Sequence, residues 1–376
     1  MDRKNLIENA IADIDRKASD RQREAGELYL RARTGDRSAR FAIAEGISTS
    51  DLPALLTPAI NVEFLANYAA YPTVWQNIVD ETIDSPTLGN VEFGGFDFST
   101  SDLIGDHDGD TFVGMGLPGV GEYGEYPAVN FTTEQLAAEL RKNGVRLRIS
   151  WEAVVNSGRV DFIGRSTAAF ARYAAEQEDV KLAKQFVGTD GSINSAIDAI
   201  TGNPVLSLEA LRNAKAQIGG VTVGGRPLGA GRYSLVMTPA LAETASEILG
   251  ISSVERTDSS TGDVYTTSTG NGNVSAVSFA ALAAVGGHDT AGAVDDAWFL
   301  VARDHARPTF AQIFLEGYRT PLISIKDSGH MSLGGGDVPA RLGNFEVDDI
   351  ETRGRHVVGA ALVTPEGVIG SDASGS

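Results

Sequence analysis

Three aspartates alternate along the run Asp106-His-Asp108-Gly-Asp110, a spacing that can begin a loop for a hard cation. A calcium loop of this kind places a bidentate glutamate at its twelfth position. In this sequence the twelfth position is Leu117. The run is therefore more typical of a repulsive acidic turn. A metal-dependent α/β enzyme that uses Asp106, Asp108 and Asp110 as ligands is the alternative.

The run Gly-Met-Gly-Leu-Pro-Gly at 114–119 matches the glycine spacing of a dinucleotide-binding loop. That loop needs a helix directly after the glycines, because the helix N-terminus receives the pyrophosphate. Here Pro118, Gly121 and Gly124 prevent a helix from starting. We interpret the run as a flexible loop and predict no cofactor.

Nucleophilic catalysis has equally little support. Ser328 and His330 lie close together in a glycine-rich stretch, but two residues specify no catalytic geometry. No lysine follows a glycine, no histidine is followed by glutamate, and no Gly-x-Ser-x-Gly occurs, which excludes three common catalytic signatures. The absence of cysteine excludes disulfides and thiolate chemistry. The sequence therefore predicts no catalytic residue, no cofactor-binding residue and no metal ligand, and a protein that is not an enzyme.

The composition is that of a folded globular protein with 376 residues, 42% of them hydrophobic, and a net charge of −19. The longest apolar run, 279–285, is too short to span a bilayer. The N-terminus lacks the apolar core of a signal peptide, so we expect a soluble protein that is not secreted by that route. The negative charge argues against general nucleic-acid binding, which needs clustered cations.

The charge is unevenly distributed. Residues 41–140 contain sixteen acidic side chains and no lysine or arginine. One interpretation is a solubilising acidic face. The other is assembly, in which this acidic segment meets basic residues of a neighbouring subunit and complementary charge fixes the register. Candidate basic residues are Arg141, Arg146, Arg148, Arg159, Arg165 and Arg172.

Hydrophobic periodicity predicts an α+β protein. Residues 3–34 have the seam of a short coiled coil and should form one helix. The prolines and glycine within 41–65 predict an extended or broken segment, and 91–130 should be a long, irregular, glycine-rich excursion with β-like pieces at 91–98 and 111–113. Alternation predicts a strand over 145–151 and favours one over 134–142. A long helix should follow over 160–186, with an apolar stripe made of Phe162, Thr167, Phe170, Tyr173 and Ala174.

The rest of the chain predicts short helices mixed with strands. Ser207 should cap a helix that ends near Ile218, and Thr238-Pro239 should open a second one that ends near Gly250. The remaining expected elements are strands at 233–237 and 297–302, a polar loop at 252–273, and two closing strands at 345–350 and 356–363.

This order of elements resembles the major capsid protein of tailed double-stranded-DNA bacteriophages, the Johnson fold. Four stretches carry the resemblance, which covers about residues 41–370: EGISTSDLPALLTPAINVEFLANYAAYPTVWQNI (45–78), VRLRISWEAVVNSGRVDFIGRSTAAFARYAAEQEDVKLAKQFVG (145–188), YSLVMTPALAETASEIL (233–249) and FEVDDIETRGRHVVGAALVTPEGVIG (345–370). The second resembles the strand, turn and long spine helix of the family, and the third a strand and helix of its axial domain.

The resemblance implies a division of the chain into six parts. These are an N-terminal charged helix or arm (1–40), a first peripheral-domain part (41–90), an extended β loop (91–148), a second peripheral part with the spine helix (149–190), a mixed axial domain (191–334), and a peripheral return with a C-terminal tail (335–376).

The resemblance also implies a function. Such subunits self-assemble through pentamers and hexamers into an icosahedral shell around packaged double-stranded DNA, which an acidic wall repels. It implies a location in the virion after assembly in the host cytoplasm, no membrane, no cofactor, and as partners a separate scaffolding protein, a portal and cementing proteins. Some relatives cross-link a lysine of the extended loop to another subunit, but residues 41–140 contain no lysine. An encapsulin-like shell around protein cargo is the nearest alternative.

Overall fold

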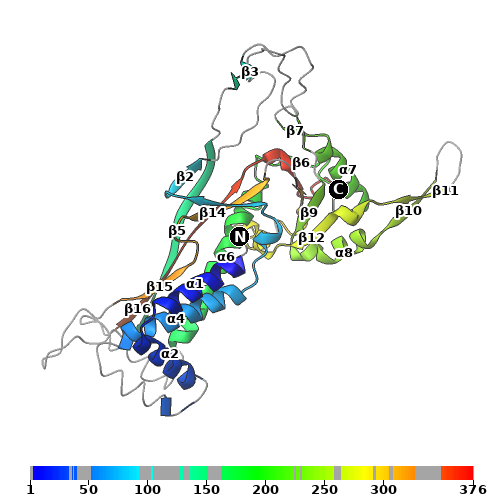
Figure 1. The fold of residues 1–376 in the computed structure, drawn as a ribbon. Coiled ribbons are helices and arrows are strands. Elements are labelled where there is room, and N and C mark those ends of the chain that lie inside the picture. Colours follow the sequence, from blue (N-terminus) through cyan, green and yellow to red (C-terminus); the bar gives the residue numbers. More distant parts are fainter. Residues whose placement is uncertain are drawn as a thin grey trace, which may run out of the picture. The chain divides into compact units, whose positions relative to one another are not determined.

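The computed structural model describes residues 3–33, 36, 38–39, 52–92, 103–104, 128–129, 135–150, 162–223, 226–228, 231–257, 264–290, 294–304, 308–326 and 349–375. The chain divides into two compact units, each built from three stretches of sequence. Unit 1 comprises Met1–Thr73, Arg141–Gln177 and Leu315–Val358, and unit 2 comprises Val74–Leu140, Glu178–Phe314 and Gly359–Ser376. Figure 1 colours the elements by their position in the sequence.

Unit 1 begins with two helices, α1 (Arg3–Lys17) and α2 (Asp20–Arg33), so the prediction of one helix over 3–34 is wrong. The Ser19 hydroxyl accepts a hydrogen bond from the Gln22 backbone N–H at 3.3 Å, and the Gln22 side chain accepts one from the Ser19 N–H at 2.8 Å. This reciprocal capping box starts a new helix after the break.

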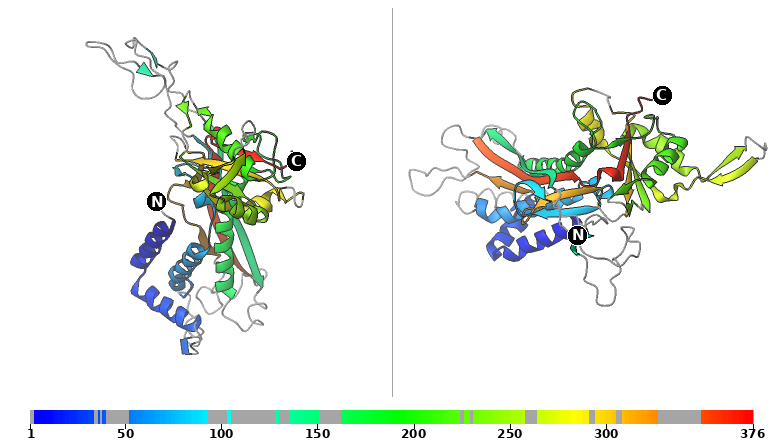
Figure 2. Two further views of the ribbon diagram at one scale, coloured as in Figure 1. Left: turned by 90° about the vertical axis from the view of Figure 1, so that its right-hand side faces the viewer. Right: turned by 90° about the horizontal axis from the view of Figure 1, so that it is seen from above.

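Helix α4 (Leu52–Ala70) contradicts the extended segment predicted within 41–65. After Pro58 the chain has no further helix breaker before Ala70, and the buried side chains Phe64, Leu65 and Tyr68 follow helical spacing. Burial of this stripe outweighs the prolines near the start of the helix. Both α1 and α2 pack against α4 (Figure 1, Figure 2).

Three antiparallel strands form the sheet of unit 1. The central strand β16 (Asp349–Leu362) pairs with β15 (Leu322–Ile325) on one side and with β5 (Gln135–Ser150) on the other. The predicted strands over 134–142 and 145–151 are therefore confirmed as parts of one strand. The two closing strands predicted at 345–350 and 356–363 are wrong as separate elements, since β16 continues through Gly354; residues 345–348 lie outside the described part of the chain.

One face of this sheet packs on the long helix α6 (Phe162–Phe186), which confirms the helix predicted over 160–186. The apolar core of unit 1 joins α4, α6 and the sheet, and Phe170, Ala171, Ala174 and Ala175 contribute the α6 side. The predicted α6 stripe is wrong at Tyr173, whose side chain is 54% exposed. Ile11 and Ile14 of α1 pack against the same core.

Unit 2 is built on a five-stranded sheet with the order β12-β9-β13-β17-β6. The strands at 233–237 and 297–302 are confirmed as β9 and β13. The strand bounds are β6 (Asp198–Ala199), β9 (Arg232–Met237), β12 (Val274–Ser278), β13 (Trp298–Arg303) and β17 (Val368–Ser371). The helical elements that accompany it are α7 (Leu208–Gly219), η3 (Pro239–Leu241), α8 (Ala242–Gly250), η4 (Asn271–Asn273), α9 (Ala280–Gly286) and η6 (Pro365–Gly367).

Two predicted helix caps have different outcomes. Ser207 caps α7 as expected, because its side chain accepts a hydrogen bond from the Ala210 N–H at 3.1 Å. Thr238 makes no capping bond, since its hydroxyl donates to the Asp295 carbonyl at 2.6 Å and the short η3 precedes α8. The Asp295 carbonyl therefore competes with the helix N-terminus for the buried Thr238 hydroxyl.

The core of unit 2 is rich in aromatic residues. The Phe186 ring lies 4.5 Å from Phe310, 5.0 Å from Phe299 and 6.5 Å from Phe279, measured between ring centroids. These four side chains and Trp298 are fully buried. Such contacts add to the hydrophobic gain of burying large rings.

Unit 2 also contains η1 (Trp75–Asn77), neighbouring strands β1 (Glu81–Ser85) and β14 (Phe310–Leu315), and β2 (Gly89–Glu92), which pairs with the first part of β5. Strands β10 (Ser253–Thr257) and β11 (Val264–Ser268) form a hairpin, so the polar loop predicted at 252–273 is wrong. Its Thr, Val and Tyr residues favour extended structure despite their polarity. Two shorter pairs are β3 (Leu103–Ile104) with β4 (Ala128–Val129) and β7 (Thr222–Val223) with β8 (Arg226–Pro227).

Candidate assembly surface

The residues that the sequence singled out for chemistry lie outside the described part of the chain. These are Asp106, Asp108 and Asp110, the glycine run 114–119, and Ser328 and His330. Within the described residues, no group of three or more His, Asp or Glu side chains could hold a metal ion. No described helix is both long and apolar enough to cross a membrane. Surface charge is therefore the remaining guide to function.

The face of the unit 1 sheet that points away from α6 is rich in cations. Opposed residues of an antiparallel ladder place their side chains on the same face. Arg148 of β5 lies opposite Glu351 of β16, and Arg353 lies opposite Arg146 on one side and Ser324 on the other. We call this surface the basic face. Its charged members are Lys142, Arg146, Arg148, Lys326, Arg353 and Arg355, together with Asp349 and Glu351.

The two carboxylates of the basic face are almost buried beneath three cations. Arg148 Nε lies 2.5 Å from Asp349 Oδ2 and 3.0 Å from Glu351 Oε1. Arg146 and Lys326 approach Glu351 within 3.7 and 3.2 Å. The hydrogen bond to Asp349 raises the pKa of the Arg148 guanidinium, which stays charged.

The cations themselves remain half exposed, at 51–60% for Arg146, Arg148 and Lys326. Because six cations outnumber two carboxylates, the basic face carries a net excess of four positive charges in a chain that is negative overall. The cross-strand ladder fixes their spacing. Such a surface can attract and align an acidic partner, an effect that salt screens.

The six arginines predicted to meet the acidic segment do not form one patch. Arg146 and Arg148 belong to the basic face, whereas Arg141 lies opposite Val358 and therefore on the α6 side of the sheet. Arg172 is on α6, 3.6 Å from Glu176 and with its guanidinium 5.0 Å from the centroid of the Tyr173 ring. Arg165 is also on α6, and Arg159 lies outside the described residues.

Sequence reasoning missed four members of the basic face, which are Lys142, Lys326, Arg353 and Arg355. A signal for the last two was present, because charged residues occupy every second position from Asp349 to Arg355. That alternation is typical of a strand with one solvated face.

Residues 132–371 match the family model for phage capsid protein. The chain belongs to the phage capsid protein family. The match runs from the start of β5 to the end of β17 and therefore covers stretches of both units. The predicted family and the α+β capsid fold are confirmed.

Several solved structures match this chain at low sequence identity. One is from Mycobacterium phage Ogopogo, at 13% identity and a TM-score of 0.39, covering 77% of this chain and 89% of that chain. A virus-like particle from Pyrococcus furiosus matches at 10% identity and a TM-score of 0.41, covering 82% and 96%. The SrpI encapsulin of Synechococcus elongatus matches at 8% identity and a TM-score of 0.43, covering 81% and 91%. A comparison with curated proteins gives no match.

As a phage capsid protein, the chain is a structural component of the virion and associates with its own copies in the shell. Association between copies gives the charged basic face a possible role. A surface with a fixed excess of charge, on a protein that must contact itself, is a natural place for contacts between subunits.

Proposed function

We propose that this chain is the major capsid subunit and forms pentamers and hexamers that close into an icosahedral shell around packaged double-stranded DNA. The observation that carries the proposal is the family match over 132–371. The basic face supports it, because it offers exposed and regularly spaced charges for contacts between copies.

The proposal includes the division implied by the resemblance, with a peripheral domain at 41–90, 149–190 and 335–376, an axial domain at 191–334 and an extended loop at 91–148. Residues 1–40 form the N-terminal arm, which braces the subunit or binds a separate scaffolding protein. A portal and cementing proteins complete the list of proposed partners. DNA would contact the inner wall without sequence specificity, since the net charge of −19 disfavours tight binding.

Light scattering of the purified chain, alone and with a co-expressed scaffolding protein, tests this proposal. We expect discrete pentamers and hexamers or closed particles in the megadalton range, with uniform shells in electron micrographs of the largest fraction. A strictly monomeric or dimeric species under all conditions of salt, crowding and scaffold would overturn it. Shells that enclose protein cargo and exclude DNA in infected or expressing cells would favour an encapsulin-like compartment instead.

The metal-dependent enzyme remains the competing class and needs its own measurement. Calorimetric titration of the subunit with Ca²⁺ and with Mg²⁺ should give no stoichiometric binding. A tight site that disappears in the triple variant Asp106→Asn, Asp108→Asn, Asp110→Asn would return the aspartate run to consideration as a metal centre.

A further inference from the structure

The hairpin of β10 and β11 forms a two-stranded sheet of its own within unit 2. Figure 1 shows both strands extending away from the rest of this unit. Every described side chain of the two strands is exposed or partly exposed, and Val264, at 65%, is the most exposed large hydrophobic residue among those described. A two-stranded hairpin is at best marginally stable alone in water, so this one should gain stability from a further partner.

Hydrogen bonds hold the base of the hairpin in a fixed position. The Thr269 hydroxyl donates to the Ile251 carbonyl at 2.6 Å, and the Thr269 N–H donates to the Ser252 carbonyl at 3.0 Å. The Asn271 side-chain amide donates to the Ile248 carbonyl of α8 at 3.2 Å. Thr269 and Asn271 are both buried. The exposed strands therefore project from a base that fixes where they leave unit 2.

Strand β12 gives unit 2 a second open edge. It is the terminal strand of the five-stranded sheet and, among the described residues, pairs with β9 alone. The side chains of Ser275 and Ala276 are exposed. A hollow of about 480 Å³, lined in part by Ser275, Ala276 and Val277, adjoins the strand and leaves room for added side chains. The outer backbone groups of such a strand are a template for pairing with another strand.

Neither β11 nor β12 has the usual protection against pairing at an edge. Natural edge strands are protected by charged side chains, proline or a bulge. Strand β11 has the sequence Val-Tyr-Thr-Thr-Ser and β12 has Val-Ser-Ala-Val-Ser, so both lack charge and proline. Their pairings with β10 and β9 are continuous in register, without a bulge. Each strand is five residues long, and the two edges therefore match in length and chemistry.

Charge favours contact between the hairpin and β12. The hairpin sequence 253–268 contains three acidic residues and one arginine. Lys215 of α7 lies at the start of β12, where its ammonium donates to the Gly270 carbonyl at 2.6 Å and to Asn273 Oδ1 at 3.0 Å. Among the described residues no carboxylate forms an ion pair with Lys215, and burial lowers the pKa of its ammonium. An acidic hairpin beside β12 would supply the complementary negative charge.

We propose that β11 of one copy pairs with the outer edge of β12 in a second copy and extends its five-stranded sheet. The inference rests on the proposed shell function and names a contact within its pentamers and hexamers. Because two different surfaces meet, the contact is heterologous, and a heterologous contact repeated around an axis produces a closed ring. Pairing of two identical edges would join only two copies. Within one chain the hairpin and the sheet of β12 are separate.

The first test places a charge on the β12 edge. Ala276→Glu introduces a carboxylate at an exposed residue of β12, and Ala240→Glu makes the same change at an exposed residue of η3. A charged edge opposes strand addition, and a carboxylate repels the acidic hairpin. We expect Ala276→Glu subunits to keep the parent circular dichroism spectrum and to form at least tenfold fewer rings and closed particles. Ala240→Glu should assemble as the parent chain does. Normal assembly of a folded Ala276→Glu chain would overturn the proposal.

A second test does not depend on how Ala276→Glu folds. Because the chain has no cysteine, pairs of cysteines can be introduced cleanly. Each chain carries Ser275→Cys or Ala276→Cys, which point to opposite faces of the sheet, together with one cysteine at an exposed position of β11, namely Val264, Thr266 or Ser268. Opposed Cα atoms of paired strands lie within about 5.5 Å, inside the reach of a disulfide. After assembly and oxidation, a non-reducing gel should show a ladder up to covalent pentamers or hexamers for at least one pair.

The outcomes separate this inference from the proposed function. If the parent chain forms no rings or particles, the shell function fails. If they form but no cysteine pair joins chains more efficiently than Ala240→Cys with the same β11 cysteines, the pairing of β11 with β12 fails alone. Efficient dimers from chains with Ala276→Cys as their single cysteine would indicate that two copies of β12 pair with each other, which would also overturn the proposal. A disulfide confined to single chains would overturn the role of a second copy.

Discussion

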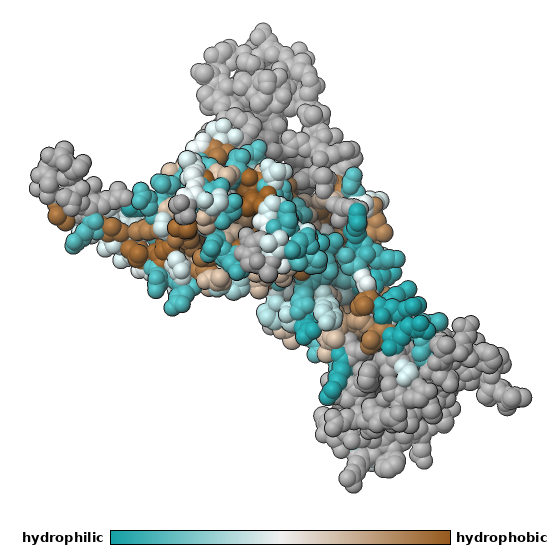
Figure 3. Space-filling model, turned by 180° about the vertical axis from the view of Figure 1, so that it is seen from behind, coloured by the Kyte–Doolittle hydropathy of each residue, from teal (hydrophilic) through white to brown (hydrophobic). Residues whose placement is uncertain are grey.

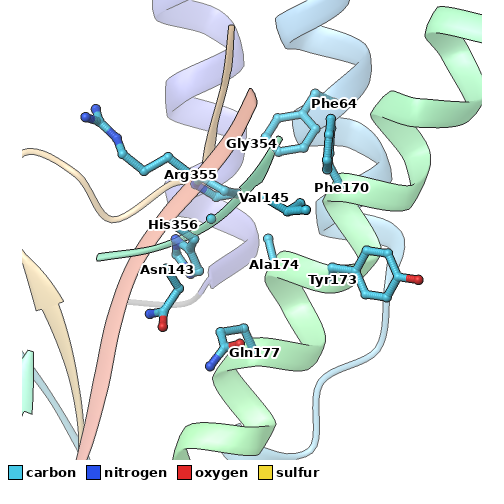
Figure 4. Close-up of a pocket in the computed structure, with 12 residues that line it drawn as sticks. Phe64, Asn143, Val145, Phe170, Tyr173, Ala174, Gln177, Gly354, Arg355 and His356 are labelled. Atoms are coloured by element: carbon cyan, nitrogen blue, oxygen red, sulfur yellow. The ribbon is translucent and has the colours of Figure 1, made fainter. Parts of the chain in front are cut away.

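The two units differ in how completely they bury their own apolar surface. In unit 2 the Phe186 ring contacts those of Phe279, Phe299 and Phe310, and all four rings are inaccessible to solvent. Among the described residues, the core of unit 1 contains several alanines, and a cavity of about 140 Å³ lined by Val145, Phe170 and Ala174 opens beside it (Figure 4). Large hydrophobic side chains are exposed in both units, namely Leu30, Val145, Tyr173, Tyr318 and Leu322 in unit 1 and Leu88, Val205, Ile251 and Val264 in unit 2.

This difference suggests separate tasks. The aromatic core of unit 2 is buried within a single chain. This is expected of a region that must be stable before subunits associate. Unit 1 combines a basic face with an unfilled apolar cavity. Each would contribute favourably to the free energy of association when a partner covers it. Hydrophobic residues at the surface are visible as brown patches among hydrophilic residues in Figure 3.

Removing a ring from the core of unit 2 should have the largest effect. Phe299 is fully buried and lies 5.0 Å from Phe186, so Phe299→Ala should lower the free energy of unfolding by about 3–5 kcal/mol. Denaturant unfolding of the unassembled subunit measures this change. We expect few particles from the variant, because little folded subunit remains.

The comparison predicts the opposite pattern for an exposed aromatic of unit 1. Tyr173→Ala should change the free energy of unfolding by less than about 0.5 kcal/mol, since its side chain is half exposed, yet it should reduce particle yield. If Tyr173→Ala destabilised the isolated subunit as much as Phe299→Ala does, the distinction between the two units would not hold.

An effect on stability smaller than that of Phe299→Ala is expected from adding a methyl group where β5 meets β16. The Cβ of Gly144→Ala would lie 2.6 Å from a backbone oxygen, so the strands must shift and the subunit should lose about 1–3 kcal/mol. Gly219→Ala in α7 is a matched control, because nothing lies within 4 Å of the added carbon. Thermal unfolding should show a lower transition for the first and no loss for the second. Equal changes in the two variants would mean that the loss of glycine flexibility, and not the contact with the Gly354 carbonyl oxygen, determines the change in stability.

Much of the fold can be predicted from the sequence because its signals are local. The Ala-rich helix α6, the alternation of β5 and the Ser207 cap each depend on neighbours within one element. The break at Ser19 also had a local signal, the Ser-x-x-Gln capping box, which the heptad seam of the surrounding residues obscured. Polar composition likewise obscured the hairpin β10–β11.

The candidate surface could not be predicted in the same way, because it depends on strand register. Arg148 meets Asp349 and Glu351 only through pairing between residues about 200 positions apart. The close approach of Gly144 to the Gly354 carbonyl depends on the pairing of the same two strands. No periodicity within either strand specifies this pairing. The charge excess of 41–140 pointed to a basic partner, but only Arg146 and Arg148 of the six predicted arginines lie on the basic face. Arg141, Arg165 and Arg172 lie elsewhere, and Arg159 is outside the described residues.

Charge on the basic face should contribute less to stability than packing does. Glu351→Gln removes a nearly buried carboxylate from beneath Arg146, Arg148 and Lys326, whose exposure to water limits the loss to about 1 kcal/mol. The face becomes more positive by one charge, so assembly should tolerate higher salt if an acidic segment binds there. Glu366→Gln, at an exposed residue of unit 2, is the control and should change neither property. Unchanged salt tolerance in Glu351→Gln would argue against an acidic partner on this face.

A small and local effect is expected in the N-terminal helices, which pack on α4 of unit 1. A substitution there tests whether these helices brace α4 before assembly. Ser19→Ala removes the hydroxyl that accepts from the Gln22 N–H and should weaken α2 by about 0.5–1 kcal/mol, whereas Ser19→Thr keeps the acceptor and should retain most of the stability. Amide hydrogen exchange resolves so local a change. Faster exchange limited to α2 would show that these helices open independently of the core. Faster exchange that spreads to α4 would instead show that the small core of unit 1 depends on the N-terminal helices, because Ile11 and Ile14 supply part of the apolar surface that unit 1 otherwise lacks.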